Sequence, residues 1–177
     1  MSHFDYESLI VDIPDYPEPG VIFKDITPLF ADAAGMRALV EDIAGHFKDA
    51  GVTKVVGPEA RGFMTGAPVA LELGAGFVPA RKPGKLPRAT YSISYQLEYG
   101  TDTLEIHRDA IKPGDRVLIV DDLIATGGTA AATGKLVQEV GAELVGYGCI
   151  LELTFLNPRE KLAEVGDHDL YSLVKVK

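Results

Sequence analysis

Several features are scarce in this 177-residue sequence, and each scarcity argues against a class of protein. Cys149 is the only cysteine, so no disulfide can form within the chain and a reducing compartment is expected. No apolar run approaches the length of a membrane span, and the first residues lack the basic and apolar regions of a secretion signal. We therefore expect a cytoplasmic globular protein that does not act at a membrane.

Positive charge is also scarce. The 17 Lys and Arg residues against 26 Asp and Glu residues give a net charge of −9, which argues against nucleic acid as a partner. The four histidines show no metal-ligand spacing with the one cysteine, so we predict no metal held by the protein alone. Any anionic ligand must therefore be captured by a local site, against the overall charge.

Apolar periodicity alternates along the chain between two kinds of segment. Helices are predicted at residues 33–50, 63–73 and 129–140; strands are predicted at residues 54–57, 77–79, 117–120 and 144–151. Two more β segments, at residues 91–97 and 103–107, are joined around Gly100. Since helices alternate with strands, the sequence predicts one α/β domain with a mainly parallel central sheet flanked by helices.

The most informative stretch is VLIVDDLIATGGT, residues 117–129. An apolar strand leads into Asp121 and Asp122, and a loop of small residues follows before the next helix. Carboxylates accept hydrogen bonds from hydroxyl groups, whereas such a loop at a helix N-terminus binds phosphate. A ribose 5-phosphate satisfies both halves. An ordinary strand, turn and capped helix would account equally well for the acids and glycines taken alone.

The whole stretch resembles the phosphoribosyl-diphosphate signature of the type I phosphoribosyltransferases. Further segments resemble the branch of this family that acts on adenine, over about residues 13–162. They are YPEPGVIFKDITPLF (16–30), GPEARGF (57–63), RKPGKLPRAT (81–90) and YQLEYG (95–100).

The resemblance implies a fold and a reaction. It implies a single phosphoribosyltransferase domain over residues 1–177, with a small N-terminal hood (about residues 1–32) over the base site and a flexible β loop. The implied reaction belongs to purine salvage: adenine and 5-phosphoribosyl 1-diphosphate give AMP and pyrophosphate. It further implies Mg²⁺ bound mainly through the diphosphate, and a homodimer in which a basic loop lies near the partner's site.

The resemblance also implies which residues bind phosphoribosyl diphosphate. They are Asp121, Asp122, Ala125, Thr126, Gly127, Gly128, Thr129, Glu59, Ala60, Arg61, Arg81, Lys82 and Lys85. Arg61 lies in a tight loop that can supply a cation to the leaving pyrophosphate, and the peptide after Glu59 is expected to be cis. The segment that begins at Arg81 forms a basic cluster, although Pro83 stands where relatives often carry another basic residue.

The remaining site residues concern the base. Glu98 is the expected catalytic residue, placed with Tyr99 on a loop that closes over the site; apolar neighbours would raise the pKa of this glutamate. For adenine itself, the implied contacts are Val21, Ile22, Phe23, Lys24 and Ile124. The extended segment 21–24 offers backbone groups to the base edge, Phe23 covers the ring, and Ile124 is an apolar wall.

Two other functions stay open from the sequence. One is a sibling transferase that uses xanthine, hypoxanthine, guanine or orotate. The other is a regulator that binds phosphoribosyl diphosphate without turnover, although the chain shows no basic recognition helix for DNA.

Overall fold

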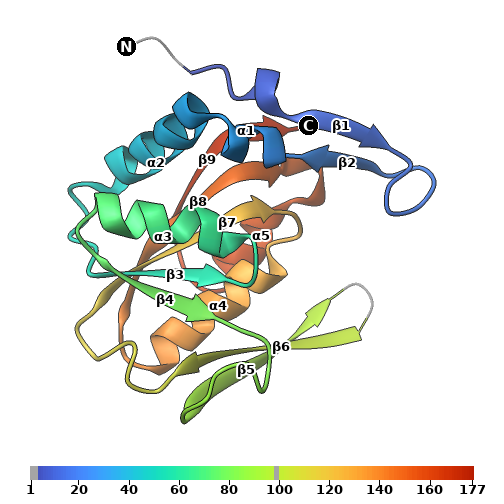
Figure 1. Cartoon of the computed structure of the whole chain (residues 1–177). Helices are drawn as coiled ribbons and strands as arrows, with labels where there is room; N and C mark the ends of the chain where they lie inside the picture. Colours follow the sequence, from blue (N-terminus) through green and yellow to red (C-terminus); the bar gives the residue numbers. More distant parts are fainter. Residues whose placement is uncertain (1–3, 98–99) are drawn as a thin grey trace.

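The centre of the molecule is a five-stranded sheet, seen in a computed structural model that describes residues 4–97 and 100–177 (Figure 1). In spatial order its strands are β4 (Gly76–Ala80), β3 (Lys54–Pro58), β7 (Arg116–Ile124), β8 (Glu143–Leu153) and β9 (Asp169–Val176). Each neighbouring pair is parallel, which confirms the predicted α/β class.

Helices cover both faces of this sheet because the central strand β7 is apolar on both sides. The main helices are α2 (Ala33–Phe47), α3 (Gly62–Glu72) and α4 (Gly128–Glu139). Leu118 and Val120 pack with residues of α2 and α3, whereas Val117 and Ile119 pack with residues of α4. Successive side chains of a strand point to opposite faces, so a continuous apolar run fits a strand buried between two helical layers.

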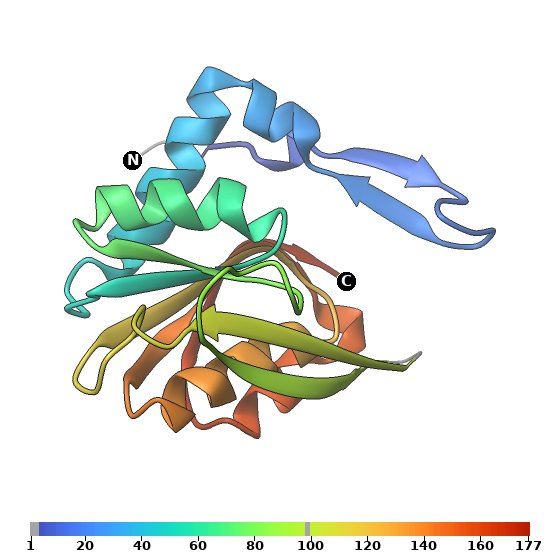
Figure 2. The ribbon, with the colours of Figure 1, turned by 60° about the horizontal axis from the view of Figure 1, so that its bottom comes forward.

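Two antiparallel hairpins extend from the side of the sheet at which its strands end (Figures 1 and 2). The first pairs β1 (Val11–Pro14) with β2 (Ile22–Asp25), and the second pairs β5 (Thr90–Leu97) with β6 (Gly100–His107). Neither hairpin contributes a strand to the five-stranded sheet, although Glu105 of β6 forms an isolated antiparallel bridge with Arg81, the residue after β4. Short elements complete the chain: η1 (Glu7–Leu9), α1 (Thr27–Ala31), η2 (Thr154–Leu156) and α5 (Pro158–Ala163).

The structure corrects the predicted end of the central strand. β7 does not stop at Val120 but continues to Ile124, because residues 121–124 remain paired with β8. Asp121 and Asp122 therefore belong to the strand rather than to the turn after it. The hairpin β1–β2, the short helices and β9 were not predicted, and within the described ranges no helix is long and apolar enough to cross a membrane.

Candidate active site

A polar pocket of about 290 Å³ lies where β3 and β7 end, and it is lined by residues 59–61 and 121–130. These two segments are far apart in the sequence, but the strands that carry them are neighbours in the sheet. The pocket gathers ten of the thirteen residues predicted to bind phosphoribosyl diphosphate. It therefore has the place expected of a ligand site in an open parallel sheet, beside the carboxyl ends of the strands.

The loop at one end of this pocket is shaped by glycine. Gly127 precedes the first residue of α4 and has φ +83°, a left-handed conformation that side chains disfavour. A Cβ atom at Gly127 would also lie 2.9 Å from the carbonyl oxygen of Pro158. The N-terminus of a helix carries free N–H groups and a partial positive charge, so this end of the pocket suits an anion.

The two aspartates of β7 have different surroundings. Asp122 is 4% exposed, and its Oδ2 lies 3.0 Å from Nε of Arg61. Oδ1 of Asp121 accepts a hydrogen bond of 2.9 Å from the N–H of Asp122, and it lies against Gly62, where a Cβ would come within 2.9 Å. Burial and the neighbouring Asp122 raise the pKa of Asp121 well above its usual value. The two aspartates, both expected to bind ribose hydroxyl groups, therefore have unequal surroundings.

Arg61 stands at the junction of the polar pocket with a second one. Its guanidinium carbon lies 5.9 Å from the centre of the Phe23 ring, while its Nε faces Asp122. The Glu59–Ala60 peptide, just before it in the chain, is cis as the resemblance implied. One cation thus touches an aromatic ring of the hood and a buried acid of the central sheet.

The second pocket is smaller and mostly apolar, with a volume of about 140 Å³. Its lining residues are Val21, Ile22, Phe23, Lys24, Ile26, Arg61, Asp122, Leu123, Leu151, Leu153, Phe155 and Val176. Arg61, Asp122 and Leu123 line both pockets, so the two pockets are adjacent. A ligand with a flat apolar part and a polar, anionic part matches this pair of pockets.

Four of the five residues predicted to contact the base line this apolar pocket, and Ile124 does not. Ile124 is 3% exposed and lines the polar pocket, while the preceding Leu123 contributes to both. Phe155, 58% exposed, and Val176 also line the apolar pocket; sequence reasoning missed both, since neither belongs to a motif.

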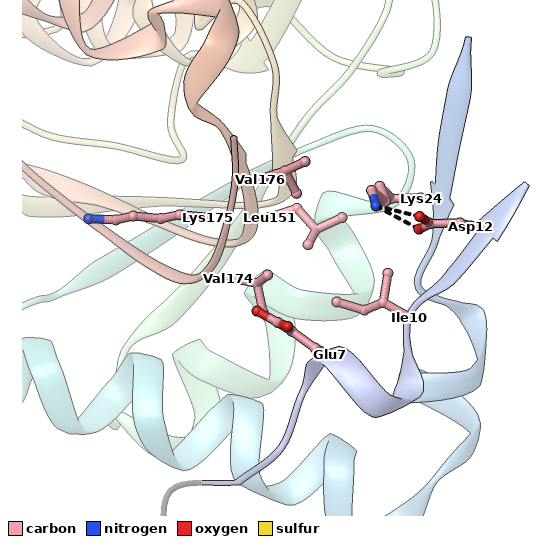
Figure 3. Close-up of a pocket in the computed structure, with 8 residues that line it drawn as sticks. All are labelled: Glu7, Ile10, Asp12, Lys24, Leu151, Val174, Lys175 and Val176. Atoms are coloured by element: carbon pink, nitrogen blue, oxygen red, sulfur yellow. Dashed lines mark hydrogen bonds and ion pairs between the residues drawn. The ribbon is translucent and has the colours of Figure 1, made fainter. Parts of the chain in front are cut away.

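Lys24 also borders a third cavity, of about 330 Å³, which shares Leu151 and Val176 with the apolar pocket (Figure 3). There its ammonium group lies 2.6 and 2.8 Å from the two carboxylate oxygens of Asp12, the residue opposite it in the hairpin. Figure 3 shows this ion pair between the two hood strands, with Lys175 directed away from it. The charge of Lys24 is therefore used within the hood, which leaves mainly its backbone and alkyl chain for the apolar pocket.

The basic segment that begins at Arg81 lines neither the polar pocket nor the apolar pocket. Arg81 pairs with Glu59 at 3.5 Å, and the ammonium group of Lys82 forms an ion pair with Asp102 of the β5–β6 hairpin. The hydrogen bond to Asp102 raises the pKa of Lys82. Lys85, the third predicted cation, is exposed. The structure thus keeps the cluster together beside the polar pocket, with two of its charges matched by acids of the same chain.

The β5–β6 hairpin touches the start of α4. The hydroxyl group of Tyr95 lies 3.2 Å from Oγ1 of Thr129, and a Cβ at Gly128 would lie 3.7 Å from the carbonyl oxygen of Gln96. Glu98 and Tyr99, the predicted catalytic residue and its neighbour, lie outside the described residues. The ends of the two strands that flank them are thus the nearest described parts of the chain.

Comparison with known proteins gives one consistent result. Residues 25–172 match the family model described as "Phosphoribosyl transferase domain". The adenine phosphoribosyltransferase of Shewanella loihica is 59% identical over 157 residues, which cover 89% of this chain and 87% of that protein.

Solved structures agree with the sequence comparison. The adenine phosphoribosyltransferase of Rhodothermus marinus superposes with a TM-score of 0.90 at 50% identity, covering 97% of this chain and 96% of that one. The Saccharomyces cerevisiae adenine phosphoribosyltransferase, solved with adenine and an imino-altritol bisphosphate, has a TM-score of 0.89 at 39% identity and covers 96% of both chains.

Proposed function

Because this chain belongs to the phosphoribosyltransferase family, we infer that its two adjacent pockets bind the two substrates of a purine-salvage reaction. The enzyme transfers the phosphoribosyl group of 5-phosphoribosyl 1-diphosphate to adenine, producing AMP and pyrophosphate. It is thus a glycosyltransferase of the pentosyl class, as are the relatives named above. One observation supports this function above the others: an apolar pocket lies next to a polar pocket, and both are lined by Arg61, Asp122 and Leu123.

We assign the parts of phosphoribosyl diphosphate to separate parts of the polar pocket. The loop of residues 125–129 binds the 5′-phosphate with its N–H groups and the N-terminus of α4. Asp121 and Asp122 bind the ribose hydroxyl groups. Residues 59–61 bind the pyrophosphate, and the positive charge of Arg61 offsets the negative charge of this group.

The basic segment receives a different assignment. Arg81, Lys82 and Lys85 do not line the polar pocket of their own chain, and the first two are paired with acids. We propose that they approach the pyrophosphate in a homodimer, where this segment lies near the partner's site. The molar mass in solution, measured by light scattering, tests the dimer directly.

Adenine occupies the apolar pocket in this proposal. The backbone of residues 21–24 offers an N–H donor and a carbonyl acceptor to the base edge, and Phe23 covers the ring. Adenine presents an acceptor at N1 beside a donor at N6, whereas hypoxanthine and guanine present the reverse. Ile124 was predicted as a wall of this pocket; we now assign the apolar contact between base and ribose to Leu123.

The reaction itself needs positioning, charge stabilisation and the transfer of one proton. N9 of adenine attacks C1′ while the bond from C1′ to the pyrophosphate oxygen breaks. In the transition state the ribose becomes oxocarbenium-like. The phosphate loop and the aspartates hold the ribose from two directions, and Arg61 offsets the charge of the leaving group. We propose that Glu98 accepts the proton that adenine loses, at N7; nearby apolar residues of its own segment favour such a role.

We propose that Mg²⁺ enters the polar pocket bound mainly to the diphosphate of the substrate. Within the described ranges, no group of three or more His, Cys, Asp or Glu side chains could hold a metal ion. Asp121 and Asp122 are the carboxylates of β7 that line the pocket, and Asp122 already faces Arg61. When bound, Mg²⁺ supplies positive charge to the diphosphate. AMP, which lacks a diphosphate, should therefore bind nearly as well without Mg²⁺, and calorimetry with a chelator tests this.

We propose that the whole chain works as one phosphoribosyltransferase domain, with about residues 1–32 as the hood over the base site. The hairpin β1–β2, which borders the apolar pocket, supports this division. We also place the enzyme in the cytoplasm, where the free, buried thiol of Cys149 stays reduced. Cell fractionation tests that location.

The choice of base is the sharpest test of the function. A 6-oxopurine would leave two buried polar groups unpaired, at roughly 1–3 kcal/mol each. With water excluded, kcat/KM for adenine should exceed that for hypoxanthine or guanine by a factor on the order of 10⁴. Pyrophosphate release with each base on one preparation measures this ratio.

Each other outcome of that assay identifies a different protein. Comparable values for a 6-oxopurine would defeat the adenine assignment and leave a sibling transferase. Binding of phosphoribosyl diphosphate without pyrophosphate release from any base would instead indicate a regulator.

A further inference from the structure

The short helix α5 lies directly behind the loop that we assign to the 5′-phosphate. At Gly127, a Cβ would meet the carbonyl oxygen of Pro158 at 2.9 Å and the Cβ of Lys161 at 3.3 Å. Pro158 is the first residue of α5, and Gly127 immediately precedes α4. No space is left between the loop and this helix, so the position of α5 limits where the loop can lie.

α5 needs an anchor because it cannot hold itself in place. It has 6 residues, too few for a stable isolated helix. Leu162 supplies one anchor, since it is 3% exposed and packs in the core. Arg159, the second residue of the helix, supplies another through a polar contact to the central sheet.

That polar contact is a bidentate ion pair with Glu152 of β8. Nε and one terminal nitrogen of Arg159 lie 2.7 and 2.8 Å from the two carboxylate oxygens, and the same terminal nitrogen donates to the carbonyl oxygen of Leu170 at 3.1 Å. Glu152 is 1% exposed and also accepts a 2.6 Å hydrogen bond from Ser172. Burial alone would raise the pKa of Glu152, but the hydrogen bonds from Arg159 and Ser172 outweigh it and lower the pKa.

Glu152 is itself placed beside the site. In the register of the sheet it lies opposite Ile124, the last residue of the strand that carries Asp121 and Asp122. The ion pair therefore connects the sheet under the aspartates to the helix behind Gly127. We propose that Arg159 is a positioning residue for the phosphate loop, which it holds in place through α5, and that Glu152 is its anchor.

The base pocket has an independent support on the same stretch of chain. Phe155 lies in η2, just before α5, where Oγ1 of Thr154 donates to the carbonyl oxygen of Val176 at 2.8 Å. A small shift of α5 should therefore disturb the phosphate loop more than the apolar pocket. This inference rests on the proposed function, because it takes the loop of residues 125–129 as the phosphate site.

The test replaces the ion pair without leaving a buried charge. The double variant Glu152→Gln with Arg159→Gln keeps hydrogen-bonding groups at both positions, and Arg159→Lys keeps the charge but not the bidentate geometry. We expect the double variant to raise the Kd of AMP and the KM of phosphoribosyl diphosphate about 10-fold. The KM of adenine should change less than about 3-fold, and Arg159→Lys should restore part of the loss.

Arg116 and Glu143 provide a matched control. They form an ion pair where β7 and β8 begin, and these ends of the two strands lie away from both pockets. The variant Arg116→Gln with Glu143→Gln should leave both substrate constants unchanged, while melting temperatures record any general loss of stability.

Two results would overturn the proposal. One is an unchanged affinity for AMP and phosphoribosyl diphosphate in both Arg159 variants. The other is an equal loss for adenine and phosphoribosyl diphosphate, which indicates a merely structural role. If the double variant does not fold, Arg159→Lys alone decides between these results. A wild-type protein that binds neither AMP nor phosphoribosyl diphosphate would instead refute the proposed function.

Discussion

The phosphate half and the base half of the site are built in opposite ways. The polar pocket lies on the central sheet: Asp122 is 4% exposed, and the loop after it is packed between α4 and α5. The apolar pocket takes one wall from the hairpin β1–β2, in which Ile22 is 60% exposed and all four residues of β1 are exposed. A two-stranded hairpin is marginally stable by itself. The comparison teaches that the phosphate half is formed by the central fold, whereas the base half takes one wall from an exposed hairpin outside the central sheet.

The base half is nevertheless fixed at its root. Ile26 and Leu29 are buried against residues of β8 and β9, and the hydroxyl group of Tyr6 donates to Asp42 of α2 at 2.6 Å. In the hairpin, β1 is exposed throughout, whereas β2 is exposed at Ile22 and half-buried over residues 23–25. We therefore expect changes in the phosphate half to reduce binding strongly, and changes in the hood to act on adenine alone.

The largest effect is expected on turnover, from a change at Glu98, which we assign to catalysis and not to the binding of either substrate. Glu98→Gln keeps the size of the side chain but removes its ability to accept the proton, so kcat should fall by about 10²–10⁴-fold. The KM of phosphoribosyl diphosphate should change little. Steady-state kinetics measure both constants, with Glu139→Gln on the exposed end of α4 as the control. Near-normal turnover would show that Glu98 only positions the base.

A change in the phosphate loop should have the next largest effect. At Gly128 a Cβ would already be in van der Waals contact with Oγ1 of Thr126 at 3.6 Å and with the carbonyl oxygen of Gln96 at 3.7 Å, so we expect the methyl groups of a valine to crowd the loop. Gly128→Val should raise the Kd of AMP roughly 100-fold, since a displacement of about 1 Å can cost that much. Calorimetry with AMP measures this change.

The control for this variant is Gly45→Val, because a Cβ at Gly45 meets no other atom within 4 Å. Free adenine should bind Gly128→Val almost as well as it binds the wild type. An unchanged affinity for AMP would contradict the assignment of the loop to phosphate.

The smallest effect should come from the hood. Phe23→Ala removes the ring that we place over adenine, and stacking of a base on an aromatic ring contributes about 1–3 kcal/mol. The KM of adenine should therefore rise about 10-fold while the KM of phosphoribosyl diphosphate stays the same. Tyr91→Ala, an exposed aromatic residue outside both pockets, is the control. An equal rise in both KM values would erase the distinction between the two halves.

The phosphate half could be predicted from the sequence because its residues are close together in the chain. A strand, two acids, a loop of small residues and a helix follow one another within residues 117–129, and local chemistry explains each of them. Arg61 could be added because a tight loop after a strand end places it at the same edge of the sheet. These inferences depend on geometry over short distances, which sequence patterns describe well.

The base half could be predicted only in part. Phe155 and Val176 reach the apolar pocket through contacts between distant segments, and no local pattern marks them. Ile124, predicted to contact the base, lines the polar pocket and not the apolar one, and the sequence could not show this for a different reason. A strand buried on both faces has no alternation of polar and apolar residues, so its sequence does not reveal which side chain faces the ligand.

The junction at Arg61 has a consequence for how the protein acquires its activity. Phe23, Arg61 and Asp122 come from the hood, the start of α3 and the central strand, so the junction forms only when segments far apart in the sequence meet. Long-range contacts of this kind, in a parallel sheet, form late and slowly during folding. The first catalytic turnover after dilution from denaturant should therefore report the completed native state, and enzyme activity should recover later than helical circular dichroism.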